Sequence, residues 1–177
     1  PRSTPSNSSA ASDVYKRQKQ EVKMKVLIVE DRNENALAAL EFFENKGMKV
    51  KIKDNAQDAI KALRKEIFLA AILDVEIPLS KGRKPEKLGP EVGWIAKETE
   101  TPHVYLTGGY FHHGPRAKVF LDELCLKEDE GDMVPDKSTS GAWAKAWEIL
   151  QSTRDLEKIY EARVRFKERA DKVYERR

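Results

Sequence analysis

Residues 25–31 read KVLIVED and residues 68–74 read FLAAILD, so two apolar runs each end directly on carboxylates. Apolar, β-branched runs of this length are typical of strands that are buried on both faces of a parallel sheet. A carboxylate at the end of such a strand needs a partner, because burying an unpaired charge is costly. Glu30, Asp31 and Asp74 therefore indicate a shared site where two strands end.

The rest of the chain alternates strand and helix patterns. MKVKIK (48–53) has the alternation of an edge strand, and HVYLT (103–107) and the weaker DMVP (132–135) predict two more strands. Helical patterns lie between the strands and extend from residue 140 onward. This order predicts an α/β fold in which helical crossovers join parallel strands. We expect a flavodoxin-like, doubly wound five-stranded parallel sheet of order 2-1-3-4-5, with a C-terminal helical extension.

The details of the first crossover also follow from the sequence. Residues 33–47 predict a helix in which Leu37, Leu40 and Phe43 fall at helical spacing, with Ala36 and Ala39 beside them. Asn33 or Asn35 can cap its start, and Gly47 can end it in a left-handed turn. Asp54 or Asn55 can cap the next helix. The stretch 76–90 has three prolines and four basic residues and predicts a long loop.

Composition divides the chain into three parts. Residues 1–23 are rich in Ser, Pro and Asn at their start and predict a disordered, non-native leader resembling translated vector sequence, with Met24 as the natural start. Residues 24–150 predict the folded domain, and residues 151–177 a charged C-terminal helix. The whole chain carries a net charge of +3. The first 20 and the last 27 residues each carry +3, so the part between them carries −3.

Several classes of protein are disfavoured by composition. The single cysteine, Cys125, excludes an internal disulfide and fits a reducing compartment. No apolar run approaches the roughly 20 residues of a membrane span, and no stretch has the order of a signal peptide. We therefore expect a cytoplasmic protein that does not contact membrane.

The acids at the strand ends predict a metal. Chemistry in an open parallel sheet collects beyond the carboxyl ends of the strands, and the first and third strands are neighbours in the expected order. Two carboxylates at about 4 Å repel each other by on the order of 4 kcal/mol at an effective dielectric near 20. A divalent cation relieves this repulsion, and Mg²⁺ prefers hard oxygen ligands. One carboxylate could then accept a phosphoryl group, assisted by Thr107 and Lys137 at the ends of the fourth and fifth strands.

This ordered set resembles a divergent receiver domain of the two-component, chemotaxis-regulator-like type, over about residues 25–150. The residues that carry the resemblance are Glu30, Asp31, Asp74, Pro78, Thr107 and Lys137. The resemblance implies that Asp74 is the phospho-acceptor. It also implies that Glu30, Asp31 and Asp74 hold Mg²⁺.

The resemblance assigns three further roles. The backbone carbonyl of Glu76 completes the protein ligands of the metal. Thr107 is the switch hydroxyl, and Lys137 is the lysine that pairs with the phosphoryl group. Two positions depart from the family pattern: Val134 stands where an aromatic switch residue is usual, and Ser138 stands where proline usually follows the lysine.

Three functions remain open at this point. The first is a signalling switch rather than an enzyme, phosphorylated by a histidine kinase or phosphotransfer protein and acting on a downstream protein partner. It would have no DNA-binding output domain and no direct nucleic-acid contact. The second is a receiver-like interaction module that needs no phosphorylation. The third is a phosphatase of the haloacid-dehalogenase type, which expects an aspartate where Glu76 stands.

Other features have two interpretations each. Lys81, Arg83, Lys84 and Lys87 form either a solvated loop or a docking site for a phosphodonor or partner. Trp143 and Trp147 lie four residues apart on one face of a helix and predict core packing, with a groove for a partner as the alternative. The tail has apolar residues near heptad spacing, interrupted by Arg163, which is compatible with a homodimer through the C-terminal helix or with a single charged helix.

Overall fold

The computed structural model describes residues 24–106 and 136–174, with side chains to residue 172. The strands are β1 (Lys25–Val29), β2 (Lys49–Lys53), β3 (Ala70–Leu73), β4 (Ile77–Pro78), β5 (Pro85–Glu86) and β6 (His103–Tyr105). The helices are α2 (Asn33–Glu44), α3 (Ala56–Lys65), α4 (Gly89–Glu98), α6 (Ser140–Thr153) and α7 (Leu156–Tyr174).

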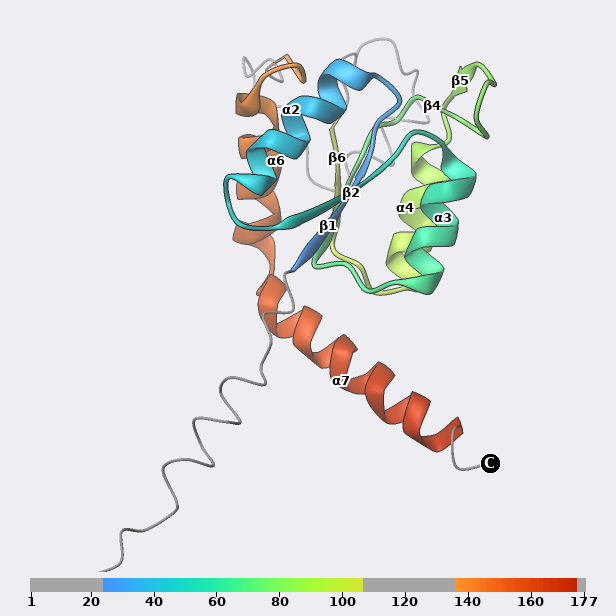
Figure 1. The fold of residues 1–177 in the computed structure, drawn as a ribbon, viewed down its shortest axis with the longest axis vertical. Helices are drawn as coiled ribbons and strands as arrows, with labels where there is room; N and C mark the ends of the chain where they lie inside the picture. Colours follow the sequence, from blue (N-terminus) through green and yellow to red (C-terminus); the bar gives the residue numbers. More distant parts are fainter. Residues whose placement is uncertain (1–23, 107–135, 175–177) are drawn as a thin grey trace, which may run out of the picture.

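A parallel sheet forms the centre of the molecule. Its order is β2-β1-β3-β6, and Val29 of β1 is aligned with Leu73 of β3. Helices α2 and α6 cover one face, and α3 and α4 cover the other (Figure 1). This arrangement confirms the predicted doubly wound α/β class and the order of the first four strands. The fifth predicted strand, at 132–135, lies outside the described residues.

The central strands are apolar because both of their faces are covered. In β1, Val26 and Ile28 pack into the core against α2 and α6, whereas Leu27 and Val29 pack into the core against α3 and α4. All four residues of β3 are buried. Edge strand β2 is only partly covered, so its lysines alternate with Val50 and Ile52. The two kinds of strand therefore differ in sequence for a physical reason.

The expected face of α2 was right in part, since Phe43, Ala36 and Ala39 are buried, but Leu37 and the expected cap were wrong. Its buried side chains include Ala36, Ala39 and Phe43, and Leu37 is 63% exposed. Leu37 directly follows buried Ala36 in the helix and so lies to one side of the buried face. Its apolar character alone does not show whether it is buried. Neither Asn33 nor Asn35 caps the helix, since Arg32 occupies the cap position without a side-chain bond.

Two other end signals were correct. Gly47, which follows α2, has a φ of +73°, the left-handed conformation that favours glycine. The Asn55 side chain accepts a hydrogen bond from the Asp58 amide and so caps α3.

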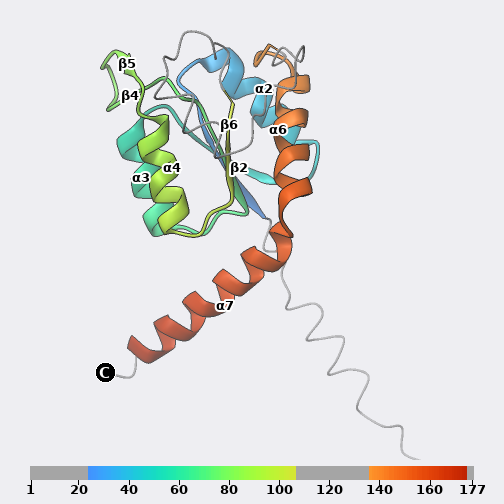
Figure 2. The same cartoon turned by 180° about the vertical axis from the view of Figure 1, so that it is seen from behind.

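The stretch 76–90 is not a plain loop. It contains the short antiparallel pair β4 and β5, and α4 already begins at Gly89. The hairpin lies at the carboxyl-end side of the sheet (Figures 1 and 2).

Helix α7 is separated from α6 by Arg154 and Asp155. Figure 2 shows α7 running beneath the sheet, on the side of the strands' amino ends. Leu156 and Tyr160 join the core of α2 and α6, and Arg163 donates to the Phe68 carbonyl and to Thr101 Oγ1. The first half of α7 thus packs on its own domain. None of the helices in the described ranges combines the length and apolar composition that a membrane crossing requires.

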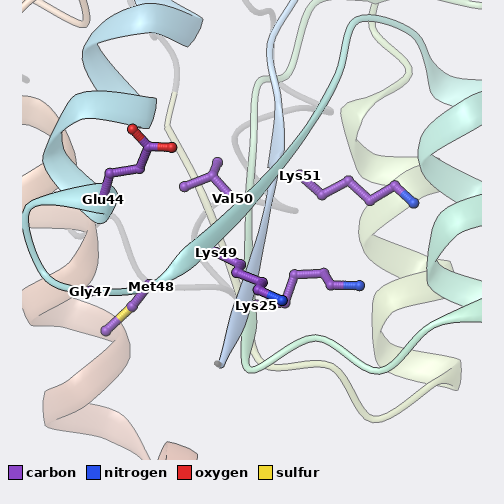
Figure 3. Close-up of a pocket in the computed structure, with 7 residues that line it drawn as sticks. All are labelled: Lys25, Glu44, Gly47, Met48, Lys49, Val50 and Lys51. Atoms are coloured by element: carbon purple, nitrogen blue, oxygen red, sulfur yellow. The ribbon is translucent and has the colours of Figure 1, made fainter. Parts of the chain in front are cut away.

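A hollow of about 470 Å³ follows the outer side of β2 at its amino end (Figure 3). Lys25 and Lys51 line it, and both bond to Glu66. These two ammonium groups therefore already have a carboxylate partner, whereas Lys49, which also lines the hollow, is exposed. The chemistry of the molecule lies at the other end of the sheet.

Candidate phosphoryl and metal site

The carboxyl ends of β1 and β3 place three acids together. Glu30 and Asp31 follow β1, and Asp74 follows β3. The Asp74 amide donates to the Val29 carbonyl at 2.8 Å, so the pairing of the two strands continues into the site. Helix α2 leaves β1 on one face and α4 follows β3 on the other. The acids therefore lie where the chain directions diverge, the usual place for a site in an open parallel sheet.

The three carboxylates form one cluster. One oxygen from each of Glu30, Asp31 and Asp74 lies within 4.8 Å of the others. Glu30 is 1% exposed and Asp74 is 8% exposed, whereas Asp31 is only partly buried. The cluster is therefore open to solvent on the side of Asp31.

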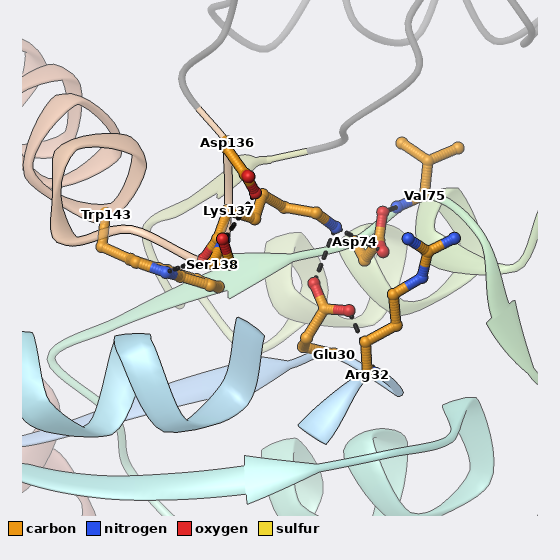
Figure 4. Close-up of polar contacts among 8 residues, drawn as sticks. All are labelled: Glu30, Arg32, Asp74, Val75, Asp136, Lys137, Ser138 and Trp143. Carbon is orange, nitrogen blue, oxygen red and sulfur yellow. Dashed lines mark hydrogen bonds and ion pairs between the residues drawn. The ribbon is translucent and has the colours of Figure 1, made fainter. Parts of the chain in front are cut away.

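Lys137 is the fourth member of the site. Its ammonium group lies between two of the carboxylates, 2.6 Å from Glu30 Oε2 and 2.6 Å from Asp74 Oδ2 (Figure 4). The side chain is 7% exposed. The sequence predicted that these residues share a site, and the structure brings all four together.

Backbone amides donate to the carboxylate oxygens of Glu30 and Asp74 that Lys137 does not contact. Glu30 Oε1 accepts from the Arg32 amide at 3.2 Å, and Asp74 Oδ1 accepts from the Val75 amide at 2.7 Å. Each buried carboxylate is thus fixed by one amide and by Lys137. This preorganises both side chains without involving solvent.

Burial and mutual repulsion act on the two acids after β1. Burial, and then the charge of Asp74, raise the pKa of Glu30, while Lys137 opposes them. The same two causes raise the pKa of Asp31. With all groups ionised the cluster carries three negative charges and one positive charge. A cation would remove the remaining repulsion and favour the ionised forms.

The donor chemistry fits Mg²⁺. Three carboxylates supply hard oxygen atoms, and the exposed side of Asp31 leaves access for water and for a phosphoryl group, which Mg²⁺ retains as ligands. The fourth predicted ligand, the backbone carbonyl of Glu76, stays a prediction. The Glu76 side chain is exposed.

The backbone at Lys137 is held by Trp143. The indole Nε1 donates to the Lys137 carbonyl at 2.8 Å, and Trp143 is 1% exposed (Figure 4). Trp143 and Trp147 pack in the core, as the sequence predicted. The bond from Trp143 to the lysine turn was missed, because helical spacing indicates a face but not a hydrogen bond.

Gly89 was also missed. A Cβ at this position would lie 2.2 Å from the Asp74 carbonyl oxygen and 2.7 Å from the Val75 Cα. The Gly89 amide donates to the Val75 carbonyl. The start of α4 therefore lies directly against the backbone of the expected phospho-acceptor. A glycine in the first turn of a helix is the signal that could have indicated this close approach.

Some predicted site residues cannot be placed. Thr107, the expected switch hydroxyl, and Val134, where the family has an aromatic residue, lie outside the described residues. So does Cys125. Ser138, at the usual proline position, is exposed, and its amide donates to Asp136 Oδ1 at 2.9 Å.

Comparison with known proteins supports the architecture. The sequence matches no protein-family model, and no curated protein matches it. Among solved structures, it is similar to a CheY-like response regulator receiver domain protein from Methanospirillum hungatei JF-1. The two are 22% identical with a TM-score of 0.54, and the match covers 76% of this chain and 97% of that one.

Two further structures are similar. The receiver domain of sensor histidine kinase PA1611 from Pseudomonas aeruginosa PAO1 is 20% identical, with a TM-score of 0.50 and coverage of 74% of this chain and 97% of that one; a magnesium ion is coordinated in its active-site cleft. A fusion that contains a trimeric coiled-coil segment of yeast Spc42 is 19% identical, with a TM-score of 0.53 and coverage of 87% and 95%. At these identities the likeness concerns the fold. The chain thus has the fold of response-regulator receiver domains.

Proposed function

We propose that this chain is a receiver that accepts a phosphoryl group on Asp74 in a Mg²⁺-dependent reaction and acts as a signalling switch. One observation carries the proposal. The carboxylate that ends β3 lies within 4.8 Å of the two acids that end β1, and the Lys137 ammonium bridges it to Glu30. In such a buried cluster, the negative charge that phosphorylation adds to Asp74 would change the interactions of the neighbouring charged groups.

The geometry indicates how transfer would proceed. Asp74 Oδ1 accepts from the Val75 amide, whereas Oδ2 accepts from the Lys137 ammonium group. Oδ2 would supply the electron pair that forms the new bond to phosphorus. The bond from phosphorus to the donor, for example a histidine nitrogen, would break, and the donor would keep that electron pair. Bound Mg²⁺ would neutralise the charges of the carboxylates and the phosphoryl oxygens.

Lys137 would then change partners. Before transfer its ammonium group neutralises Asp74 and Glu30. After transfer the phosphoryl group carries roughly −1.5 to −2 charges at pH 7, so Lys137 would follow it. The Lys137 backbone is tied through Trp143 to α6. Movement of this lysine would therefore bias the position of the turn that leads into α6, which is how a local charge change could reach a surface.

A second function is favoured by the same ion pairs. Lys137 partly neutralises the cluster without a metal, so the domain is also compatible with a role as a phosphorylation-independent interaction module. If replacing Asp74 by Asn left partner binding and cellular function unchanged, this second function would be preferred. In either case we expect a histidine kinase or phosphotransfer protein, or a downstream protein, as the partner.

A homodimer through α7 is a further proposal about partners. The first half of α7 packs on its own domain through Leu156 and Arg163, whereas Phe166 is 76% exposed. Any contact with a second copy would therefore use the half of α7 that begins near Phe166.

The test is the mass of the protein after incubation with Mg²⁺ and phosphoramidate. We expect the wild type to gain one phosphoryl group and to lose this gain when EDTA replaces Mg²⁺. The Asp74→Asn variant should gain none, because the amide is not a nucleophile. Equal labelling of this variant and the wild type would refute Asp74 as the acceptor.

A further inference from the structure

A basic hairpin stands next to the acidic site. It comprises β4, the turn, β5 and Lys87, which directly follows β5, and it begins three residues after Asp74. We refer to residues 77–87 as the basic hairpin. Its exposed cations are Lys81, Arg83, Lys84 and Lys87.

The hairpin is anchored rather than loose. Its first strand is buried, with Ile77 at 0% exposure, and it pairs antiparallel with β5. The Leu79 carbonyl accepts from the Gln57 amide at 3.1 Å, which ties the hairpin to the first turn of α3. Gly82 forms the turn with a φ of +82°. The four cations are therefore presented from a fixed support.

None of the four cations forms an ion pair with a residue in the described ranges 24–106 and 136–174. Within the hairpin, Glu86 is the only carboxylate that opposes them. The nearby cluster of Glu30, Asp31, Asp74 and Lys137 has an excess of negative charge when ionised. A phosphodonor is itself an anion, so this cluster alone would repel it.

We propose that the basic hairpin is a docking surface for an acidic segment of the protein that donates the phosphoryl group. This inference rests on the proposed function and adds the chemistry of the partner. Carboxylates that flank the donor histidine would contact the hairpin, and the donor group would face Asp74. Charges of opposite sign at the rim of a site increase the rate of encounter and fix the orientation of the partner.

A short acidic protein segment fits this surface better than a nucleic acid. Nucleic-acid binding uses basic side chains that follow an extended phosphate backbone. Here the four cations are confined to one hairpin, and the nearby acid cluster is buried except for Asp31, which is partly exposed. An extended polyanion that continued past the hairpin would be repelled by these carboxylates. A protein segment can instead end its acidic stretch at the hairpin.

The experiment compares two synthetic phosphohistidine peptides, one with flanking glutamates and one with flanking glutamines. Phosphoryl transfer to the wild-type chain should be about tenfold faster from the glutamate peptide, and the difference should shrink at about 0.5 M salt. The variant Lys81→Gln/Arg83→Gln/Lys84→Gln/Lys87→Gln should lose the preference. The matched control Lys158→Gln/Arg165→Gln/Arg169→Gln/Lys172→Gln removes the same charge from exposed positions on α7 and should keep it.

Two measurements separate this inference from the proposed function. Labelling by phosphoramidate with Mg²⁺ should be the same in the wild type and both variants; failure of labelling in the wild type would refute the proposed function. Binding of the unphosphorylated glutamate peptide, measured by fluorescence anisotropy, tests docking without any transfer. Equal binding by the wild type and the hairpin variant would overturn the inference. Tighter binding of a single-stranded oligonucleotide than of the glutamate peptide would overturn it as well.

Discussion

At the residue scale, Lys137 acts as the internal counterion of the site. Its ammonium group lies 2.6 Å from each of two buried carboxylates. Removing one partner from a buried ion pair usually costs more than the pair contributes, because the other charge stays buried without compensation. The stability of the chain should therefore depend strongly on this residue.

We predict that Lys137→Met lowers the free energy of unfolding at pH 7 by about 3 kcal/mol. The loss should shrink as the pH falls. Burial and the charge of Asp74 already raise the pKa of Glu30, and without Lys137 the folded state would bind protons more readily than the unfolded state. Urea unfolding at several pH values checks this. The exposed control Lys158→Met should change stability by less than about 0.5 kcal/mol, and equal stability of Lys137→Met and wild type would contradict the ion pairs.

Gly93 offers a second prediction at this scale. A Cβ at Gly93 would lie 1.8 Å from the hydroxyl oxygen of Tyr105, which is buried. Alanine is normally the better helix former by about 1 kcal/mol. Here we expect Gly93→Ala to destabilise the chain by about 1–3 kcal/mol through overpacking.

Thermal or urea unfolding measures the effect. The control Lys97→Ala, at an exposed position of the same helix, should not destabilise comparably. Adding Tyr105→Phe to Gly93→Ala should recover part of the loss, because the hydroxyl makes the closest contact. A stabilising effect of Gly93→Ala would show that α4 and β6 are not packed as described.

The sequence indicated the charged residues of the site but not their supports. Glu30, Asp31 and Asp74 could be predicted because each follows an apolar run, and the carboxyl ends of neighbouring parallel strands meet. The role of Trp143 could not be predicted, because helical spacing does not specify its bond to the Lys137 carbonyl, and the glycine in the first turn of α4 indicates a close approach without naming the backbone that it approaches. Such contacts exist only after the elements have packed.

At the element scale, Arg163 attaches helix α7 to the segments just before strands β3 and β6. The Arg163 guanidinium donates to the Phe68 carbonyl at 2.9 Å, just before β3, and to Thr101 Oγ1 at 3.0 Å, just before β6. The sequence showed Arg163 only as an interruption of heptad spacing. In the structure, Arg163 is one of the residues that hold α7 against the domain, together with Leu156 and Tyr160.

We predict that Arg163→Met lowers the free energy of unfolding by about 1–2 kcal/mol, since the Phe68 carbonyl loses its side-chain donor. Amide hydrogen exchange in α7 should become faster than in α6. The control Arg165→Met removes only an exposed pair with Glu161, at 3.4 Å, and should have little effect. Unchanged exchange in α7 of the Arg163 variant would show that this arginine does not anchor the helix.

Elements were predictable to the extent that their patterns are local. The buried strands β1 and β3 follow from continuous apolar runs, and β2 follows from its alternation. The hairpin of β4 and β5 was missed because two-residue strands have no period to detect. The orientation of α2 was predicted only in part, because Phe43 and the two alanines are buried as expected, whereas Leu37 is exposed.

At the scale of the whole molecule, the two ends of the sheet have different roles. The amino ends are covered by α7 and carry the pair of lysines bound to Glu66. The carboxyl ends carry the acid cluster, Lys137 and the basic hairpin (Figure 1). The contacts of α7 thus lie at the opposite end of the sheet from the acid cluster, where Lys137 contributes both to stability and to the proposed chemistry.

The central claim is that Glu30, Asp31 and Asp74, which follow two neighbouring strands, together bind one Mg²⁺ ion. Calorimetric titration with Mg²⁺ tests this claim most directly. We predict one binding event in the wild type and a loss of most of the affinity in Asp31→Asn and in Asp74→Asn. Thermal unfolding would confirm that both variants remain folded. Absence of Mg²⁺ binding by the folded wild type, or binding by both variants with wild-type affinity, would contradict the account.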